Sequence, residues 1–265
     1  MTAINETVDL SHITQSNNNF IDIDQMEPKN NILIIGKRGF GKSLIIKNLI
    51  KHYNEKYNIT KCVVISQTEK FNKFYGNFID GKIYDELNDN LINNIINYQK
   101  MNMDDLLIII DDSIKHKFRS NVFNDMIING RHYNITLIMA LQYSFFSPEI
   151  RMNIDHIFLS NDEIISSRKK LYEHYCGCFS TFKKFNDAFN KLNNFNFMFI
   201  NKCQSAKYCK VIDFLDKLNI CGLEFENSSS DPNESEYIKI NKKEFEMIKN
   251  KIKELEQLMS NVIYL

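Results

Sequence analysis

Eight consecutive residues, Gly36 to Ser43, form a glycine-rich pattern suited to binding phosphate. They match G-x-x-x-x-G-K-[ST] at every fixed position, after an apolar run (31–35) and before an amphipathic segment (42–56). Glycines let the backbone N–H groups of such a loop surround phosphate oxygens at the start of a helix. We expect Lys42 to reach the β- and γ-phosphates of a nucleoside triphosphate and Ser43 to hold Mg²⁺. The predicted nucleotide-binding residues are Gly36, Lys37, Arg38, Gly39, Phe40, Gly41, Lys42, Ser43 and Leu44.

An acidic pair follows another apolar run, about 70 residues downstream of this loop. Asp111 and Asp112 come directly after residues 106–110, whose continuous apolar character predicts a buried strand. An acid at the end of such a strand can position Mg²⁺, and we assign this role to Asp111. Asp112 would then polarise the water that attacks the γ-phosphate, or it is a turn or helix-capping residue before Ser113. A second acid at this position favours hydrolysis over phosphoryl transfer to a metabolite.

Gln142 and two arginines flank the next apolar run, residues 135–141. Gln142 follows the run, where it can hydrogen-bond γ-phosphate and attacking water together; the alternative is a solvated strand-end glutamine. Only five of the 33 basic residues are Arg, so each arginine suggests a need for its planar fork, which grips phosphate bidentately. Arg131 or Arg151 can serve as an arginine finger or sensor for the γ-phosphate, and Arg151 is the better candidate to act on the site of a neighbouring subunit. The alternative for each is a surface ion pair. The candidate catalytic residues are thus Lys42, Asp112, Gln142, Arg131 and Arg151.

Short apolar runs alternate with helix-length segments from residue 30 onward. The runs lie at 31–35, 62–66, 106–110, 135–141, 156–160 and 195–201, and candidate helices lie near 42–56, 86–101, 117–128, 161–175 and 181–193. Such runs are typical of strands buried on both faces of a parallel sheet, and the alternation favours a doubly wound fold. The predicted fold class is an α/β P-loop NTPase of the additional-strand type, with a mainly parallel central sheet flanked by helices.

The two ends of the chain differ from this pattern. Residues 1–29 are polar and Asn-rich and predict an N-terminal arm, which leaves 30–222 as the ATPase domain. Residues 223–237 are acidic and Ser-rich and predict a linker. Residues 238–265 predict a C-terminal helix with a heptad-like apolar stripe, which packs on its own domain or contacts another subunit.

Composition restricts the class of protein. The 265 residues are 43% apolar and 25% charged, which is typical of a globular chain and excludes a disordered one. We expect no transmembrane segment, because no apolar run approaches the roughly 20 residues that span a bilayer. The start lacks a signal-peptide pattern, and six Cys without a C-x-x-C pair indicate reduced thiols in an intracellular protein. A zinc site built from His174, Cys176, Cys178, Cys203 and Cys209 is the less favoured alternative, since its C-x-C spacing is tight.

The formal net charge is zero, which argues against a globally basic nucleic-acid binder. A local basic surface stays possible. Candidate DNA contacts are residues 168–170 and 183–184, which are basic and have aromatic neighbours, although lysine-rich helices are commonly just solvated. Any contact with DNA must therefore come from one face of the protein or of an assembly.

Four segments together resemble the genome-packaging ATPases of nucleocytoplasmic large DNA viruses, the poxvirus-like branch of the FtsK–HerA superfamily, which virophages also carry. They are GKRGFGKS, LLIIIDDS, NGRHYNITLIMALQ and PEIRMNIDHIFL, and the resemblance covers about residues 30–201. It implies that ATP and Mg²⁺ drive double-stranded DNA into a preformed capsid. It also implies a ring of subunits, a pentamer or hexamer, with nucleotide at the interface and an arginine from the neighbour. Asp112 departs from relatives outside the virus branch, which generally have Glu.

The resemblance further implies a location in the host cytoplasm or viral factory, with assembling virions and with capsid or membrane-associated virion proteins as partners. Two other functions stay open. A nucleoside or nucleotide kinase shares the loop and sheet, but it needs a lid and an acceptor site, and the Asp111–Asp112 pair with Gln142 argues against it. The other alternative is a nucleotide-binding assembly protein that hydrolyses little ATP.

Overall fold

A computed structural model describes residues 23, 26–111, 120–143, 146–193, 195–202, 205–210 and 218–225, all of which belong to one unit, residues 1–227. Several sequence predictions lie outside the described residues. These are most of the N-terminal arm, Asp112, the linker from residue 226 and the C-terminal helix over 238–265.

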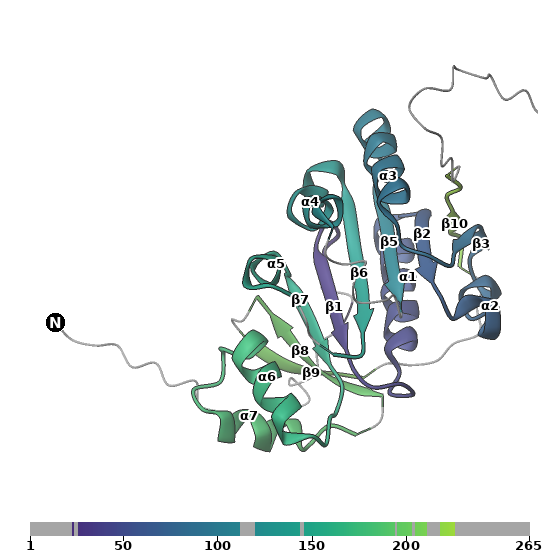
Figure 1. Cartoon of the computed structure of the whole chain (residues 1–265). Coiled ribbons are helices and arrows are strands. Elements are labelled where there is room, and N and C mark those ends of the chain that lie inside the picture. Colours follow the sequence, from purple (N-terminus) through teal and green to yellow (C-terminus); the bar gives the residue numbers. More distant parts are fainter. Residues whose placement is uncertain are drawn as a thin grey trace, which may run out of the picture. The chain divides into compact units, whose positions relative to one another are not determined.

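Five parallel strands form the centre of the sheet (Figure 1). They are β1 (Asn31–Ile35), β2 (Lys61–Ser66), β5 (Leu106–Asp111), β6 (Ile135–Leu141) and β7 (His156–Leu159). Their order is β2-β5-β6-β1-β7, so β6 separates the strand before the phosphate loop from the strand that ends in the acid. The additional-strand α/β fold class is confirmed.

Shorter strands extend this sheet on both sides. Among the described residues the sheet has ten strands, with β3 (Asp80–Gly81), β4 (Ile83–Tyr84) and β10 (Cys221–Gly222) on the β2 side. Beyond β7 follow β8 (Asn196–Asn201) and β9 (Ser205–Lys210), both antiparallel to their neighbours. The sequence predicted β8 as a strand but neither its direction nor its partner β9.

Helices cover both faces of the sheet (Figure 1). On one face lies α1 (Lys42–Tyr57); on the other lie α3 (Asp89–Asn102), α4 (Asn121–Asn129), α5 (Pro148–Met152), α6 (Ile165–Tyr175) and α7 (Phe182–Phe189). Short turns of helix are α2 (Glu69–Asn72), η4 (Tyr75–Asn77) and η6 (Gly130–Tyr133). None of the helices in the described part of the chain could span a membrane.

The period of two along β1 shows how the two layers are built. Ile32 and Ile34 pack in the apolar cluster with α1, whereas Leu33 and Ile35 pack in the cluster under α3 to α7. Every residue of β1 is buried, because the strand has helices on both sides. Because β1 is buried on both faces, it holds the start of the phosphate loop in a fixed position.

Residues just outside both predicted boundaries of the ATPase domain contact the folded unit. Met26, in the predicted arm, is buried, and its carbonyl oxygen lies 2.6 Å from His52 Nε2 of α1. The Tyr84 hydroxyl lies 3.4 Å from the Leu223 carbonyl oxygen and 3.3 Å from that of Phe225. The end of the arm and residues 223–225 of the predicted linker are therefore part of the folded unit, because their backbone groups have partners on it.

Candidate nucleotide-binding site

The phosphate loop leaves β1 at the carboxyl edge of the sheet and ends where α1 begins. The Gly36 N–H donates to the Leu141 carbonyl of β6 at 3.0 Å, which ties the start of the loop to the neighbouring strand. Gly39 has a φ of 83° and Gly41, the N-cap of α1, a φ of 93°. Glycine adopts this left-handed region without steric cost, and such residues can turn backbone N–H groups toward an anion at a helix start.

Two residues that the sequence did not single out pack against the loop. A Cβ atom on Gly36 would lie 2.1 Å from Ser160 Oγ, at the end of β7. A Cβ on Gly41 would lie 2.8 Å from the ring of Phe195, which is 43% exposed and precedes β8. Close neighbours thus favour glycine at both positions, and at Gly41 the positive φ favours it as well.

The structure brings the predicted lysine, serine and aspartate together. Lys42 is buried, and its Nζ donates to the Lys37 carbonyl of the loop at 3.2 Å. Ser43 Oγ donates to Asp111 Oδ2 at 2.8 Å. Asp111 lies at the end of β5 and is only 2% exposed. The phosphate loop and the end of β5 are therefore in contact although β6 lies between β1 and β5.

The oxygen atoms of this pair fit Mg²⁺. Mg²⁺ prefers oxygen ligands and is commonly held by one or two protein groups together with water and phosphate oxygens. The Ser43 hydroxyl and the Asp111 carboxylate are 2.8 Å apart and lie beside the phosphate loop. Their role as Mg²⁺ ligands stays a prediction, with a donor set that suits it.

A tyrosine that no sequence motif marks also contacts the acid. The Tyr75 hydroxyl donates to Asp111 Oδ2 at 2.7 Å, and Tyr75 is 1% exposed. Its turn is held by Glu69, whose two carboxylate oxygens accept the N–H groups of Tyr75 at 3.0 Å and Gly76 at 2.8 Å. Spacing alone could not have found this contact, because Tyr75 and Asp111 are 36 residues apart.

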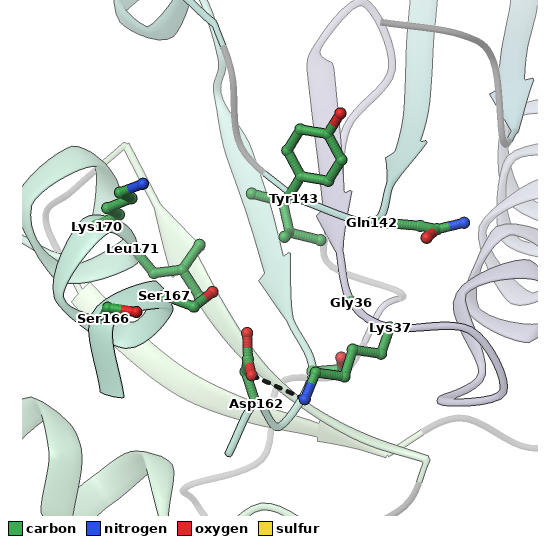
Figure 2. Close-up of a pocket in the computed structure, with 11 residues that line it drawn as sticks. Gly36, Lys37, Gln142, Tyr143, Asp162, Ser166, Ser167, Lys170 and Leu171 are labelled. Atoms are coloured by element: carbon green, nitrogen blue, oxygen red, sulfur yellow. Dashed lines mark ion pairs between the residues drawn. The ribbon is translucent and has the colours of Figure 1, made fainter. Parts of the chain in front are cut away.

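A pocket of about 240 Å³ adjoins the loop on the side of α6 (Figure 2). Lys37 lines it and pairs with Asp162, with 3.0 Å between Nζ and Oδ1. Burial raises the pKa of Asp162, but hydrogen bonds from Ser167 and the Ile164 N–H, together with Lys37, outweigh burial and hold that pKa below its usual value. The ion pair therefore fastens the phosphate loop to the segment after β7.

Gln142 lines the same pocket and directly follows β6. This places it between the strand end that carries Gly36 and the strand end that carries Asp111. Its side chain is exposed and points away from α6 (Figure 2). A sensor role for Gln142 stays a prediction.

Arg131 lies at the opposite edge of the sheet. Its Nη2 is 3.8 Å from Asp155 Oδ2, and the same oxygen accepts the N–H of Asn31, the first residue of β1. β1 has five residues, and at about 3.3 Å per residue this edge is roughly 16 Å from the loop. Arg131 precedes β6 and Gln142 follows it, so the two predicted catalytic residues lie at opposite ends of the same strand. Action in trans stays a prediction.

Arg151 lies on α5, between β6 and β7. Its Nη1 donates to the Phe146 carbonyl at 2.9 Å, which joins α5 to the segment that leaves β6. Whether Arg151 completes a neighbour's site stays a prediction, as does the role of Asp112.

Arg168 is a structural residue, which corrects its interpretation as a DNA contact. It is 6% exposed, its Nη1 donates to Asn186 Oδ1 at 2.8 Å and also to Asn190 Oδ1, and its guanidinium stacks over Phe189. Arg168 thus joins α6 to α7. The side chains of Lys169, Lys170, Lys183 and Lys184 are exposed, and DNA contact by these four stays a prediction.

The sheet separates two cysteines of the zinc alternative. Cys176 packs in the apolar cluster under α6 and α7, whereas Cys209 packs in the cluster with α1. These two sulfurs cannot share a metal ion, and Cys203 lies outside the described residues.

The strand order and the meeting of loop and acid define a P-loop NTPase of the additional-strand type. The chain belongs to the poxvirus A32 protein family, whose model matches residues 18–171. It is 34% identical over 197 residues to the uncharacterized protein 088R of Invertebrate iridescent virus 3, covering 70% of this chain and 73% of that one. It is 30% identical over 211 residues to the uncharacterized protein L437 of Acanthamoeba polyphaga mimivirus, covering 72% and 69%. The poxvirus-like resemblance is confirmed.

Solved structures share the fold. The genome packaging NTPase B204 of Sulfolobus turreted icosahedral virus 2, in complex with AMPPCP, matches with a TM-score of 0.58 and 16% identity, over 71% of this chain and 100% of that one. The pCW3 conjugation coupling protein TcpA with ATPγS matches with a TM-score of 0.53 and 13% identity, over 74% and 62%. At these identities the likeness is one of fold.

Proposed function

We propose that the protein is an ATP-hydrolysing motor that moves double-stranded DNA into a viral capsid. The observation that carries this proposal is the 2.8 Å hydrogen bond between Ser43 and Asp111, which joins loop and acid across an intervening strand. This is the arrangement that an Mg²⁺–ATP site needs, in a chain that belongs to the poxvirus A32 protein family. The packaging function named for B204 supports the proposal.

In this proposal each residue has one role. Backbone N–H groups of residues 36–44 bind the phosphates, and Lys42 moves from the Lys37 carbonyl to the β- and γ-phosphates. Bound Mg²⁺ would neutralise charge on the phosphate oxygens. Asp112 polarises the attacking water, and Gln142 orients that water against the γ-phosphate.

Coupling to DNA requires an assembly. A ring puts the exposed edge of the phosphate loop against a neighbour, and Arg151 is the residue that we expect to act in trans. Because the net charge is zero, DNA must bind a local basic surface, for which Lys169, Lys170, Lys183 and Lys184 are candidates. We place the motor in the host cytoplasm or viral factory, at assembling virions.

The test is ATP hydrolysis by the assembled protein with and without duplex DNA. We expect DNA to stimulate turnover in the wild type. Lys42→Ala should lose nucleotide binding and hydrolysis, and Asp112→Asn should bind ATP without turning it over. Lys51→Ala, on the far part of α1, is the control and should behave as the wild type.

Each competing function has its own result in this experiment. An oligomer that hydrolyses ATP at the same rate with and without DNA contradicts packaging. Phosphorylated nucleoside products would indicate a kinase. Nucleotide binding without turnover in the wild type would indicate an assembly protein.

A further inference from the structure

We propose that Tyr75 is a positioning residue for the nucleotide site, whose hydroxyl holds the Asp111 carboxylate in the orientation that binds Mg²⁺. The inference rests on the proposed function, because it assigns a role at the same Mg²⁺–ATP site. It adds a residue that lies outside both the phosphate loop and the acidic strand.

Two hydroxyl groups reach the same carboxylate oxygen from separate elements. Asp111 Oδ2 accepts from Tyr75 at 2.7 Å and from Ser43 at 2.8 Å. Hydrogen bonds to an ionised acceptor are about twice as strong as neutral ones. Two such bonds from different directions restrict rotation of a carboxylate that stands at the end of a buried strand.

Tyr75 and Ser43 belong to different structural elements. Ser43 belongs to the phosphate loop, and its oxygen is the predicted Mg²⁺ ligand, so its contacts change when nucleotide binds. Tyr75 belongs to η4, where Glu69 binds the backbone N–H groups of Tyr75 and Gly76. Its bond to Asp111 can therefore persist in both states of the loop.

Packing fixes the phenol ring before any ligand arrives. The ring centroid lies 5.1 Å from that of Phe74 and 5.9 Å from that of Phe78, and Tyr75 belongs to the apolar cluster under α1. A phenylalanine would fill the same space, so packing does not account for the hydroxyl. A buried hydroxyl costs free energy unless it has a partner, and Asp111 provides one.

The test compares Tyr75→Phe with the wild type and with Tyr53→Phe. Tyr53 is a matched control, because it is fully buried in the same cluster and its hydroxyl contacts the Glu27 carbonyl, away from the site. Mn²⁺ binding to the protein–ADP complex is titrated by electron paramagnetic resonance. Loss of a partner of a metal ligand typically weakens metal affinity tenfold or more, so we expect Mn²⁺ to bind Tyr75→Phe about tenfold more weakly.

A second measurement separates positioning from a general effect on the fold. Affinity for a fluorescent ATP analogue without divalent metal should be the same in all three proteins. Hydrolysis by Tyr75→Phe should need more Mg²⁺ for half-maximal rate and should approach the wild-type rate at saturating Mg²⁺. Tyr53→Phe should match the wild type in each assay.

The outcomes distinguish this inference from the proposed function. Equal Mn²⁺ affinity in Tyr75→Phe and wild type overturns the inference and leaves the packaging proposal intact. An equal loss with and without metal also overturns it, because Tyr75 would then support the loop in general. A wild type that binds no nucleotide overturns both. If Tyr75→Phe does not fold, Glu69→Gln, which loosens the turn of Tyr75, must show the same metal-specific weakening.

Discussion

Gly36 is the position where the phosphate loop tolerates added volume least. A Cβ there would lie 2.1 Å from Ser160 Oγ and 2.8 Å from Ser160 Cβ, and Ser160 is buried. We expect Gly36→Ala to lower the free energy of unfolding by roughly 1–3 kcal/mol, as overpacking of a core does. Urea unfolding followed by circular dichroism measures the change.

Ser160 supplies the control for that prediction. No hydrogen-bond partner of its Oγ is found among the described residues, so Ser160→Ala should leave stability nearly unchanged. Ser160→Gly removes both atoms that a Cβ on residue 36 would meet. The double variant Gly36→Ala/Ser160→Gly should therefore lose less free energy of unfolding than the two single variants lose in sum. Simple additivity would contradict a direct clash.

Some residues of the site could be predicted from the sequence and others could not. Lys42, Ser43 and Asp111 were predictable, because loop chemistry and strand ends depend on local sequence. Tyr75 and Asp162 were not, because their contacts exist only after β2 and β7 are placed beside their neighbours. Local pattern identifies the chemistry, whereas the residues that orient it depend on tertiary structure.

At the scale of the helices, the role of Arg168 could not be predicted either, because it depends on tertiary contacts. Arg168 joins α6 to α7 through Nη1, which donates to Asn186 and Asn190, while its Nε donates to the Asp162 carbonyl. A lysine has one side-chain nitrogen and lacks the planar fork that serves both groups of partners. We expect Arg168→Lys to lower the free energy of unfolding by about 2 kcal/mol, the scale of a lost hydrogen bond to a charged group. Lys169→Ala, next to it and exposed, should change stability by less than about 0.5 kcal/mol.

DNA binding by the folded variants checks this assignment. Arg168→Lys should bind duplex DNA as the wild type does at a temperature where both are folded. Weaker DNA binding with unchanged thermal stability would restore Arg168 as a DNA contact.

The central elements were predictable because their patterns are long and continuous. The predicted strands at 31–35 and 135–141 coincide with β1 and β6, since each is a mainly apolar run buried on both faces. β3, β4 and β10 have two residues each, too few for any period. The direction of β8 depends on its pairing with β7 and β9, which no local pattern reports.

At the scale of the whole molecule, one buried histidine should make the fold sensitive to acid. Burial lowers the pKa of His156 from 6.5 to about 4; the nearby Asp155 raises it and Lys202 lowers it. The folded protein therefore keeps His156 neutral while the unfolded chain binds a proton below pH 6.5. Stability should fall by roughly 3 kcal/mol as the pH falls from 6.5 to 4, since each pKa unit corresponds to about 1.4 kcal/mol.

His156→Phe isolates this contribution, because a phenyl ring can keep the stacking of His156 on Phe199. Urea unfolding of both proteins across this pH range gives the difference in slope. We expect the variant to lose less stability on acidification than the wild type. Parallel pH profiles would show that His156 does not control the acid response.

In the proposed ring, Arg151 or Arg131 of one subunit would complete the nucleotide site of its neighbour. Lys42→Ala subunits lack a working phosphate loop but still carry Arg151, whereas Arg151→Ala subunits have the loop without the arginine. If Arg151 acts in trans, each variant ring alone is inactive, and rings assembled from an equal mixture regain activity wherever an intact loop faces an intact arginine. Random mixing in a head-to-tail ring creates that pairing at about a quarter of the interfaces, so about a quarter of wild-type ATP turnover should return. The same mixture made with Arg131→Ala tests the other arginine. No recovery from either mixture would mean that neither arginine serves a neighbour's site.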